Sequence, residues 1–187
     1  MGANRLDGKV CAAKVESSLS SRIRDLTESG SSPHLAVVIV GDDPASHVYV
    51  RSKERACERL GIRSTRIDLP AAASFDKVLA TVESLNQDPD VDGILVQSPL
   101  PRGMDELAIT DHILPEKDVD GFHPVNLGRL VQGRLDGLLP CTPAGVMYLL
   151  KFAELDLTGL KAVVLGRSRI VGTVSYTHLT LPTICSV

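Results

Sequence analysis

Three polar segments of the chain hold residues whose types and spacing could transfer protons or bind a ligand. In SHVYVRSK, Tyr49 and Lys53 stand four residues apart, so they share one face of a helix. In ILVQSPLP, Gln97 follows an apolar run, and in PEKDVDGFHP, Asp118 and Asp120 precede a glycine. Each segment also has a plainer interpretation: a solvated helix lysine, an amide that bonds only its own loop, and acids that form a turn.

A fourth segment has the pattern of a nucleotide-binding loop. An apolar run at 162–165 leads into a turn that contains Gly166, Arg167, Ser168 and Gly172. The spacing departs from the common G-x-G-x-x-G, because a serine replaces the middle glycine and the last glycine is displaced. Arg167 could meet a 2′-phosphate and favour NADP over NAD. It could equally be a plain surface charge.

The elements that must position these residues alternate between strands and helices. Apolar runs predict buried strands, and Asp43, Ser74 and Thr142 are the expected helix caps. This order predicts an α/β fold with a mainly parallel sheet covered on both faces, a three-layer α/β/α domain. In such a sheet, ligand-binding and catalytic residues lie beyond the carboxyl ends of the strands. The expected strands are 35–41, 63–69, 91–97 and 161–165, and the expected helices are 10–26, 44–60, 75–85, 104–114, 125–131 and one from 142.

Composition excludes several classes of function. The net charge is −3 and no Lys/Arg run stands out, which argues against a nucleic-acid partner. No apolar run is long enough to span a membrane, and the N-terminal residues lack a secretory signal. The cysteines lie far apart without a C-x-x-C pair, so we expect no metal site and a reducing, cytoplasmic location.

Taken in order, the segments VYVRSK, ILVQSPLP, PEKDVDGFHPVNLGRL, PCTP and VVLGRSRIVG closely resemble the bifunctional FolD family. The resemblance covers nearly everything from Leu6 to Gly172. It implies NADP-dependent oxidation of 5,10-methylenetetrahydrofolate to 5,10-methenyltetrahydrofolate. It also implies hydrolysis of that product to 10-formyltetrahydrofolate.

The resemblance also assigns roles to individual residues. It implies that Lys53 is the catalytic lysine, that Gln97 assists it, that Asp120 holds the pterin ring and that Tyr49 stacks on the folate. A lysine performs such proton transfers when its surroundings favour the neutral amine. Ser98 stands where leucine is common in the family, which puts local packing in doubt more than chemistry. The implied substrate-binding residues are Tyr49, Lys53, Val96, Gln97, Ser98, Pro99 and Asp120.

For the cofactor, the resemblance implies that Gly166, Arg167 and Ser168 contact NADP, at a site that is incomplete in this chain. Arg169 stands where asparagine or lysine is common. The expected domains are 1–141 for folate binding and catalysis and 142–172 for the first helix and strand of a truncated Rossmann domain.

Residues 173–187 hold no acid, lysine or arginine and show no helical period, so we expect a non-native read-through of artificial DNA. A natural divergent tail is the alternative. The expected partners are tetrahydrofolate substrates and, for the full-length parent, a second copy in a homodimer. Two rival hypotheses remain: a catalytically silent fragment that at best binds folate, and the substrate lobe of another two-domain dehydrogenase.

Overall fold

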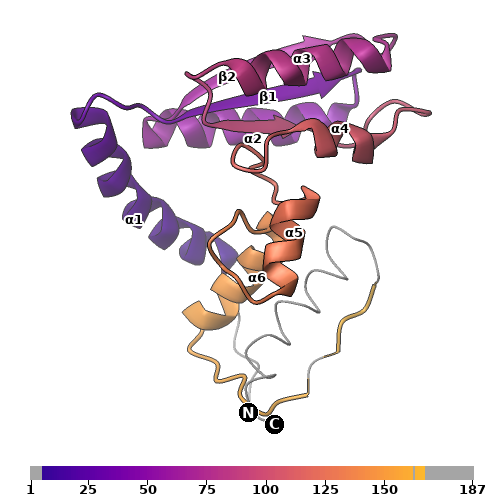
Figure 1. Ribbon diagram of the computed structural model, residues 1–187. Coiled ribbons are helices and arrows are strands. Elements are labelled where there is room, and N and C mark those ends of the chain that lie inside the picture. The colour runs from indigo at the N-terminus through magenta and orange to yellow at the C-terminus, as the bar shows by residue number, and fades with distance from the viewer. Residues whose placement is uncertain (1–5, 162, 167–187) are drawn as a thin grey trace. The chain divides into compact units, whose positions relative to one another are not determined.

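The computed structural model describes residues 6–161 and 163–166, which form two compact units (Figure 1). One unit is the continuous segment Ser18–Val119. The other combines the segment up to Ser17 with the segment from Asp120 onward. These compact units do not test the predicted domain boundary between residues 141 and 142, which stays a prediction.

The unit Ser18–Val119 is built on a sheet of three parallel strands in the order β2-β1-β3. The strands are β1 (His34–Val40), β2 (Arg63–Leu69) and β3 (Gly93–Val96). In the register, Val38 of the central strand lies opposite both Ile67 and Val96. The central strand is apolar because both of its faces are covered, and its side chains from Ala36 to Val40 are buried.

Helices cover the two faces of this sheet, as the alternation of elements predicted (Figure 1). Successive strand residues point to opposite faces. Val37 and Ile39 therefore pack with Val50 of α2 (Pro44–Leu60). On the opposite face, the core is shared with α3 (Phe75–Gln87) and α4 (Glu106–His112). The buried members of that face are Ala36, Val38, Val40, Val78, Val82, Leu85, Val91, Ile94, Ile109 and Ile113.

Local sequence signals explain where α2 and α3 begin and where α2 ends. The Asp43 side chain accepts a hydrogen bond from the Ser46 backbone N–H over 2.8 Å, and Pro44 takes the first helical position. Gly61 ends α2 with a φ of +76°, a conformation that favours glycine. Ser74 caps α3 by accepting from the Lys77 N–H. The predicted caps Asp43 and Ser74 are therefore confirmed.

The second unit contains helices and no strand among its described residues. Its helices are α5 (Pro124–Val131), α6 (Cys141–Phe152) and the first part of α1 (Gly8–Glu28), which continues into the other unit. The Lys14 ammonium lies 5.4 Å from the centre of the Phe152 ring, so α1 and α6 meet here.

Two predictions for this unit are wrong. Thr142 does not cap α6, because the helix begins at Cys141 with Pro140 at the cap position, two residues before the predicted cap, and no side chain makes a capping bond there. Pro143 is then the third helical residue, where its missing N–H removes no intrahelical bond. The expected strand 161–165 is also not formed: residues 161 and 163–166 have no regular structure, and residue 162 lies outside the described residues. A strand needs a neighbour to bond, and the described part of this unit has none.

Candidate functional site

Lys53 and Gln97 meet where β3 ends. The Gln97 backbone N–H donates to the carbonyl of Val38 over 2.9 Å, which extends the parallel pairing with β1 one residue past β3. Lys53 lies on α2, which follows β1. Its Nζ donates to Oε1 of Gln97 over 3.1 Å. The structure therefore brings together the predicted catalytic lysine and the residue predicted to assist it.

The orientation of the Gln97 amide is fixed from its other end. Nε2 of Gln97 donates to the Ser98 carbonyl over 2.7 Å. That carbonyl also accepts from Oγ of Ser46 over 3.3 Å. Because a carbonyl only accepts, it selects the NH₂ end of the amide and leaves Oε1 for Lys53.

Ser46 is a member of this site that the sequence analysis missed. Its side chain is 2% exposed, although serine is seldom so deeply buried. The spacing of Ser46, Tyr49 and Lys53, three and then four residues apart, places all three on one face of α2. That periodicity is the signal that could have found it.

Tyr49 is one turn before Lys53 and presents 63% of its surface to solvent. An exposed aromatic ring beside a polar pair offers a flat apolar surface for a ligand ring. Of the other predicted substrate contacts, Val96 is half-buried and Pro99 is exposed. The peptide bond from Ser98 to Pro99 is cis.

The Ser98 side chain is engaged with Glu106, a second residue that sequence reasoning missed. The Ser98 hydroxyl donates to the Oε1 carboxylate oxygen of Glu106, in the first turn of α4. We call Ser46, Lys53, Gln97, Ser98 and Glu106 the Ser98 network. All five lie in the unit Ser18–Val119.

The acidic segment divides between the two units. Asp118 is 1% exposed and forms a parallel bridge with Ile94 beside β3, so it is not a solvent-exposed turn residue. Lys117 anchors the segment, because its Nζ donates to the carbonyls of Leu85, Asn86 and Asp88 at the end of α3. Asp120 is half-buried and is the first residue of the second unit's later segment.

Gly121, directly after Asp120, has no room for a side chain. Its φ is +71°, and an added Cβ would lie 2.5 Å from the carbonyl carbon of Leu139 and 2.6 Å from the nitrogen of Pro140. Both atoms are backbone, so a flexible side chain cannot move aside to make space. The glycine therefore fixes the backbone that follows Asp120 against the segment leading into α6.

The Asp43 cap is the site's clearest electrostatic feature. The backbone N–H of Ser46 and then its hydroxyl hold the pKa of the Asp43 carboxyl below its usual value. The carboxylate is therefore favoured at the start of α2, the helix that carries Tyr49 and Lys53.

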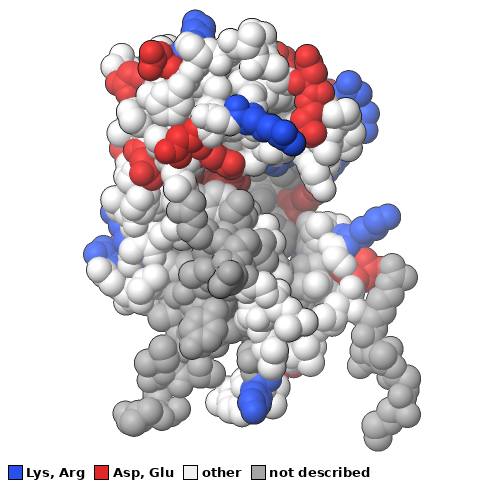
Figure 2. Space-filling view, turned by 90° about the vertical axis from the view of Figure 1, so that its right-hand side faces the viewer, with Lys and Arg blue, Asp and Glu red and all other residues white. Residues whose placement is uncertain are grey.

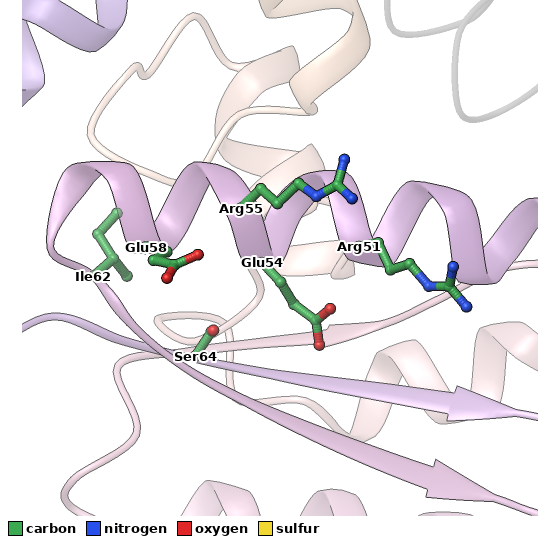
Figure 3. Close-up of a pocket in the computed structure, with 6 residues that line it drawn as sticks. All are labelled: Arg51, Glu54, Arg55, Glu58, Ile62 and Ser64. Carbon is green, nitrogen blue, oxygen red and sulfur yellow. The ribbon is translucent and has the colours of Figure 1, made fainter.

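A separate groove of about 520 Å³ lies along α2 beside β2 (Figure 3). None of the predicted site residues lines it, and its charges are mixed. Figure 2 likewise shows acidic and basic side chains interspersed over the visible face. The groove residues are Arg51, Glu54, Arg55, Glu58, Ile62 and Ser64.

Within residues 6–161 and 163–166, no group of three or more His, Cys, Asp or Glu side chains could hold a metal ion. No helix in the same ranges is long and apolar enough to cross a membrane. Of the predicted NADP contacts, Gly166 is described, with a φ of +121° and no described atom within 4 Å of the position of an added Cβ. That backbone, free of a side chain, fits close approach by a pyrophosphate. Arg167, Ser168 and the predicted tail at 173–187 lie outside the described residues.

Comparison with known proteins gives matches to two family models. Residues 6–120 match the tetrahydrofolate dehydrogenase/cyclohydrolase catalytic domain. Residues 140–184 match the NAD(P)-binding domain of the same family, so this match extends into the segment predicted to be non-native.

Individual relatives agree with these matches. The bifunctional protein FolD of Halalkalibacterium halodurans is 51% identical over 172 residues, which are 92% of this chain and 61% of that protein. FolD of Methanospirillum hungatei is 55% identical over 167 residues, 89% of this chain and 58% of its own length. The chain thus spans about three fifths of these relatives.

Solved structures share the fold. FolD from Campylobacter jejuni superposes with a TM-score of 0.93 at 46% identity, over 95% of this chain and 63% of that one. FolD from Trypanosoma brucei, solved with NADP and an inhibitor, has a TM-score of 0.93 at 34% identity, over 98% of this chain and 63% of its own.

Proposed function

The chain belongs to the tetrahydrofolate dehydrogenase/cyclohydrolase family, and from this we propose that its protein interconverts one-carbon folates. The reactions are NADP-dependent oxidation of 5,10-methylenetetrahydrofolate and hydrolysis of the resulting 5,10-methenyltetrahydrofolate to 10-formyltetrahydrofolate. The observation that carries the proposal is the hydrogen bond from Nζ of Lys53 to Oε1 of Gln97. This hydrogen bond holds the Lys53 nitrogen in one place near the carboxyl ends of the strands, where ligands bind in such sheets.

Hydrolysis needs proton transfer at two points. Water addition to the methenyl carbon releases a proton, and opening of the ring breaks the bond to N5, which gains one. We assign both transfers to Nζ of Lys53, and we assign to Gln97 the task of holding that nitrogen without adding charge. Tyr49 stacks on the folate, and the Asp120 carboxylate accepts hydrogen bonds from the pterin ring. Val96, Ser98 and Pro99 complete the proposed substrate contacts.

Oxidation depends on the nucleotide cofactor, which accepts the hydride from the folate methylene carbon. Gly166, Arg167 and Ser168 would hold it, and the choice of NADP over NAD is assigned to Arg167. The task of the protein is to hold the two rings in a reactive arrangement. The homodimer and the cytoplasmic location stay predictions.

The purified chain tests this function through binding and turnover measured separately. We expect 5-formyltetrahydrofolate, a stable folate, to bind in calorimetry. We expect Lys53→Ala to lose hydrolysis of methenyltetrahydrofolate by about 10²- to 10⁴-fold, the usual contribution of positioned proton transfer. Lys77→Ala, which removes an exposed lysine from α3, is the matched control. Near-normal hydrolysis by Lys53→Ala would rule out the assignment.

One observation favours a second candidate for this chain, a folate-binding unit without dehydrogenase activity. Residues 161 and 163–166 form no strand, and Val163 and Leu165 are 76% and 94% exposed. A dinucleotide site of this type needs a strand before its loop and a helix after it. NADPH formation from methylenetetrahydrofolate separates the candidates: turnover that Lys53→Ala abolishes supports the first, and folate binding without NADPH supports the second.

A further inference from the structure

Ser98 is the point where two sets of contacts meet. Its carbonyl accepts from Gln97 and from Ser46, and its hydroxyl donates to Glu106. From this arrangement we propose that Glu106 is a positioning residue for the Lys53–Gln97 pair and that it acts through Ser98. The inference rests on the proposed function for its catalytic meaning, but the geometry that it describes can be measured without turnover.

The first step of the argument concerns the Gln97 amide. Its two ends are alike in size, and only Oε1 can accept the hydrogen bond from Lys53. The Ser98 carbonyl decides between them by binding Nε2. If that carbonyl moves, the amide loses the contact that sets its orientation, and Lys53 loses a fixed acceptor.

The second step concerns what holds the Ser98 carbonyl. Ser98 lies in the irregular segment between β3 and α4, so no helix or strand hydrogen bonds fix it. Ser46 supplies one anchor, from α2. Glu106 supplies the second, from a helix that is itself held by the Asp105 cap and by Ile109, which is 1% exposed. A bond from a hydroxyl to a carboxylate is charge-assisted and stronger than a neutral one.

The third step concerns the identity of residue 98. A leucine at this position would have no hydroxyl and could make no such bond to Glu106, so the contact depends on the serine. The same bond competes with the predicted substrate contact of Ser98, because the hydroxyl already donates its proton to Glu106. A substrate contact would act independently of Glu106, whereas positioning through Ser98 would not.

The experiment is a double-mutant cycle on Ser98→Ala and Glu106→Ala, read by NMR of the Gln97 side-chain amide in the ¹⁵N-labelled chain. The signals are assigned by their loss in Gln97→Leu. We expect each single variant to move them toward the values of a solvated glutamine. We expect the double variant to move them no further than Ser98→Ala alone.

Two further variants act as controls for this cycle. Glu106→Gln keeps an oxygen that accepts from Ser98, so it should restore the wild-type signals. Asp111→Ala removes an exposed carboxylate from the same helix and should leave them unchanged. In methenyltetrahydrofolate hydrolysis, Glu106→Ala should lower kcat by about 3- to 10-fold, as expected for one hydrogen bond. KM should change little, and Glu106→Gln should recover kcat.

The inference is overturned if Glu106→Ala leaves the Gln97 signals unmoved. It is also overturned if the signal shifts caused by Ser98→Ala and Glu106→Ala add up in the double variant. If Glu106→Ala does not fold by circular dichroism, Ser98→Ala breaks the same contact from the other side and carries the test. A wild-type chain that neither binds nor hydrolyses folate would remove the proposed function. The NMR cycle would still decide the positioning role.

Discussion

Lys53 and Gln97, 44 residues apart in the chain, are joined by a hydrogen bond of 3.1 Å from Nζ to Oε1. Replacing Gln97 by leucine keeps its approximate size and removes the acceptor. We expect hydrolysis of methenyltetrahydrofolate to fall by about 10-fold or more, because a hydrogen bond made by a charged group contributes more than one between neutral groups. Gln87→Leu, on the exposed face of α3, is the control. Equal rates for the two variants would contradict a role for the pair.

The Asp43 cap predicts a specific dependence on pH. Because hydrogen bonds from Ser46 depress the pKa of Asp43, the charged cap stabilises the fold above about pH 4. That contribution is lost as the pH falls through the lowered folded value. The midpoint temperature of thermal unfolding should therefore be lower for Asp43→Ala than for wild type near neutral pH. The two temperatures should approach each other in acid.

Asp43→Asn separates the charge from the hydrogen bond, since asparagine also caps helices. The difference between the Asn and Ala variants should stay nearly constant as the pH falls. A constant difference between wild type and Asp43→Ala across the acidic range would show that the cap does not titrate in the folded protein.

Gly121→Ala should destabilise the fold by roughly 2–4 kcal/mol, from a positive φ and from overpacking. Gly159 provides a matched control, because its φ of +72° is almost the same as the +71° of Gly121 but no described atom lies within 4 Å of the position of an added Cβ. Gly159→Ala should therefore cost only about 1–2 kcal/mol. Denaturant unfolding measures both. Equal losses would mean that the approach of Gly121 to Leu139 and Pro140 is relieved by a backbone shift.

Lys117→Met should lower stability by about 2 kcal/mol, because three carbonyls at the end of α3 lose a charged donor. Lys77→Met, on the exposed face of the same helix, should be nearly neutral. The measurement is urea unfolding of each variant. If Lys117→Met is as stable as the control, water replaces the ammonium at these carbonyls and the segment needs no such anchor.

Arg167 gives the prediction for coenzyme choice. In a protein that binds both coenzymes, Arg167→Gln should weaken NADP far more than NAD, because only NADP carries the 2′-phosphate. Fluorescence titration with each reduced coenzyme measures the two affinities. An equal loss for both would assign the arginine to the shared pyrophosphate or to the loop itself.

The sequence predicted features that depend on near neighbours. Asp43 and Ser74 cap α2 and α3 because their capping contacts lie within a few residues. The pairing of Lys53 with Gln97 came from family resemblance, since spacing alone left Lys53 as a plausible solvated lysine. Ser46 and Glu106 were missed because their importance lies in contacts with Ser98, which only the folded chain brings about.

The two wrong predictions have a related cause. Thr142 has a good capping side chain, but the proline two residues before it sets the start of α6. Residues 161–165 have the composition of a strand, and composition cannot supply the neighbouring strand that would hold them.

The continuity of Ser18–Val119 has a consequence for synthesis on the ribosome. Domains generally fold as units in the order in which they emerge. All three described strands and the whole Ser98 network are complete once Val119 has emerged, before the residues from Asp120 onward leave the ribosome. The segment up to Ser17 is translated before Ser18–Val119, yet its compact unit also contains residues from Asp120 onward. The segment up to Ser17 therefore emerges before Ser18–Val119 but completes its own unit only after it, so chaperones can reach this segment in the interval.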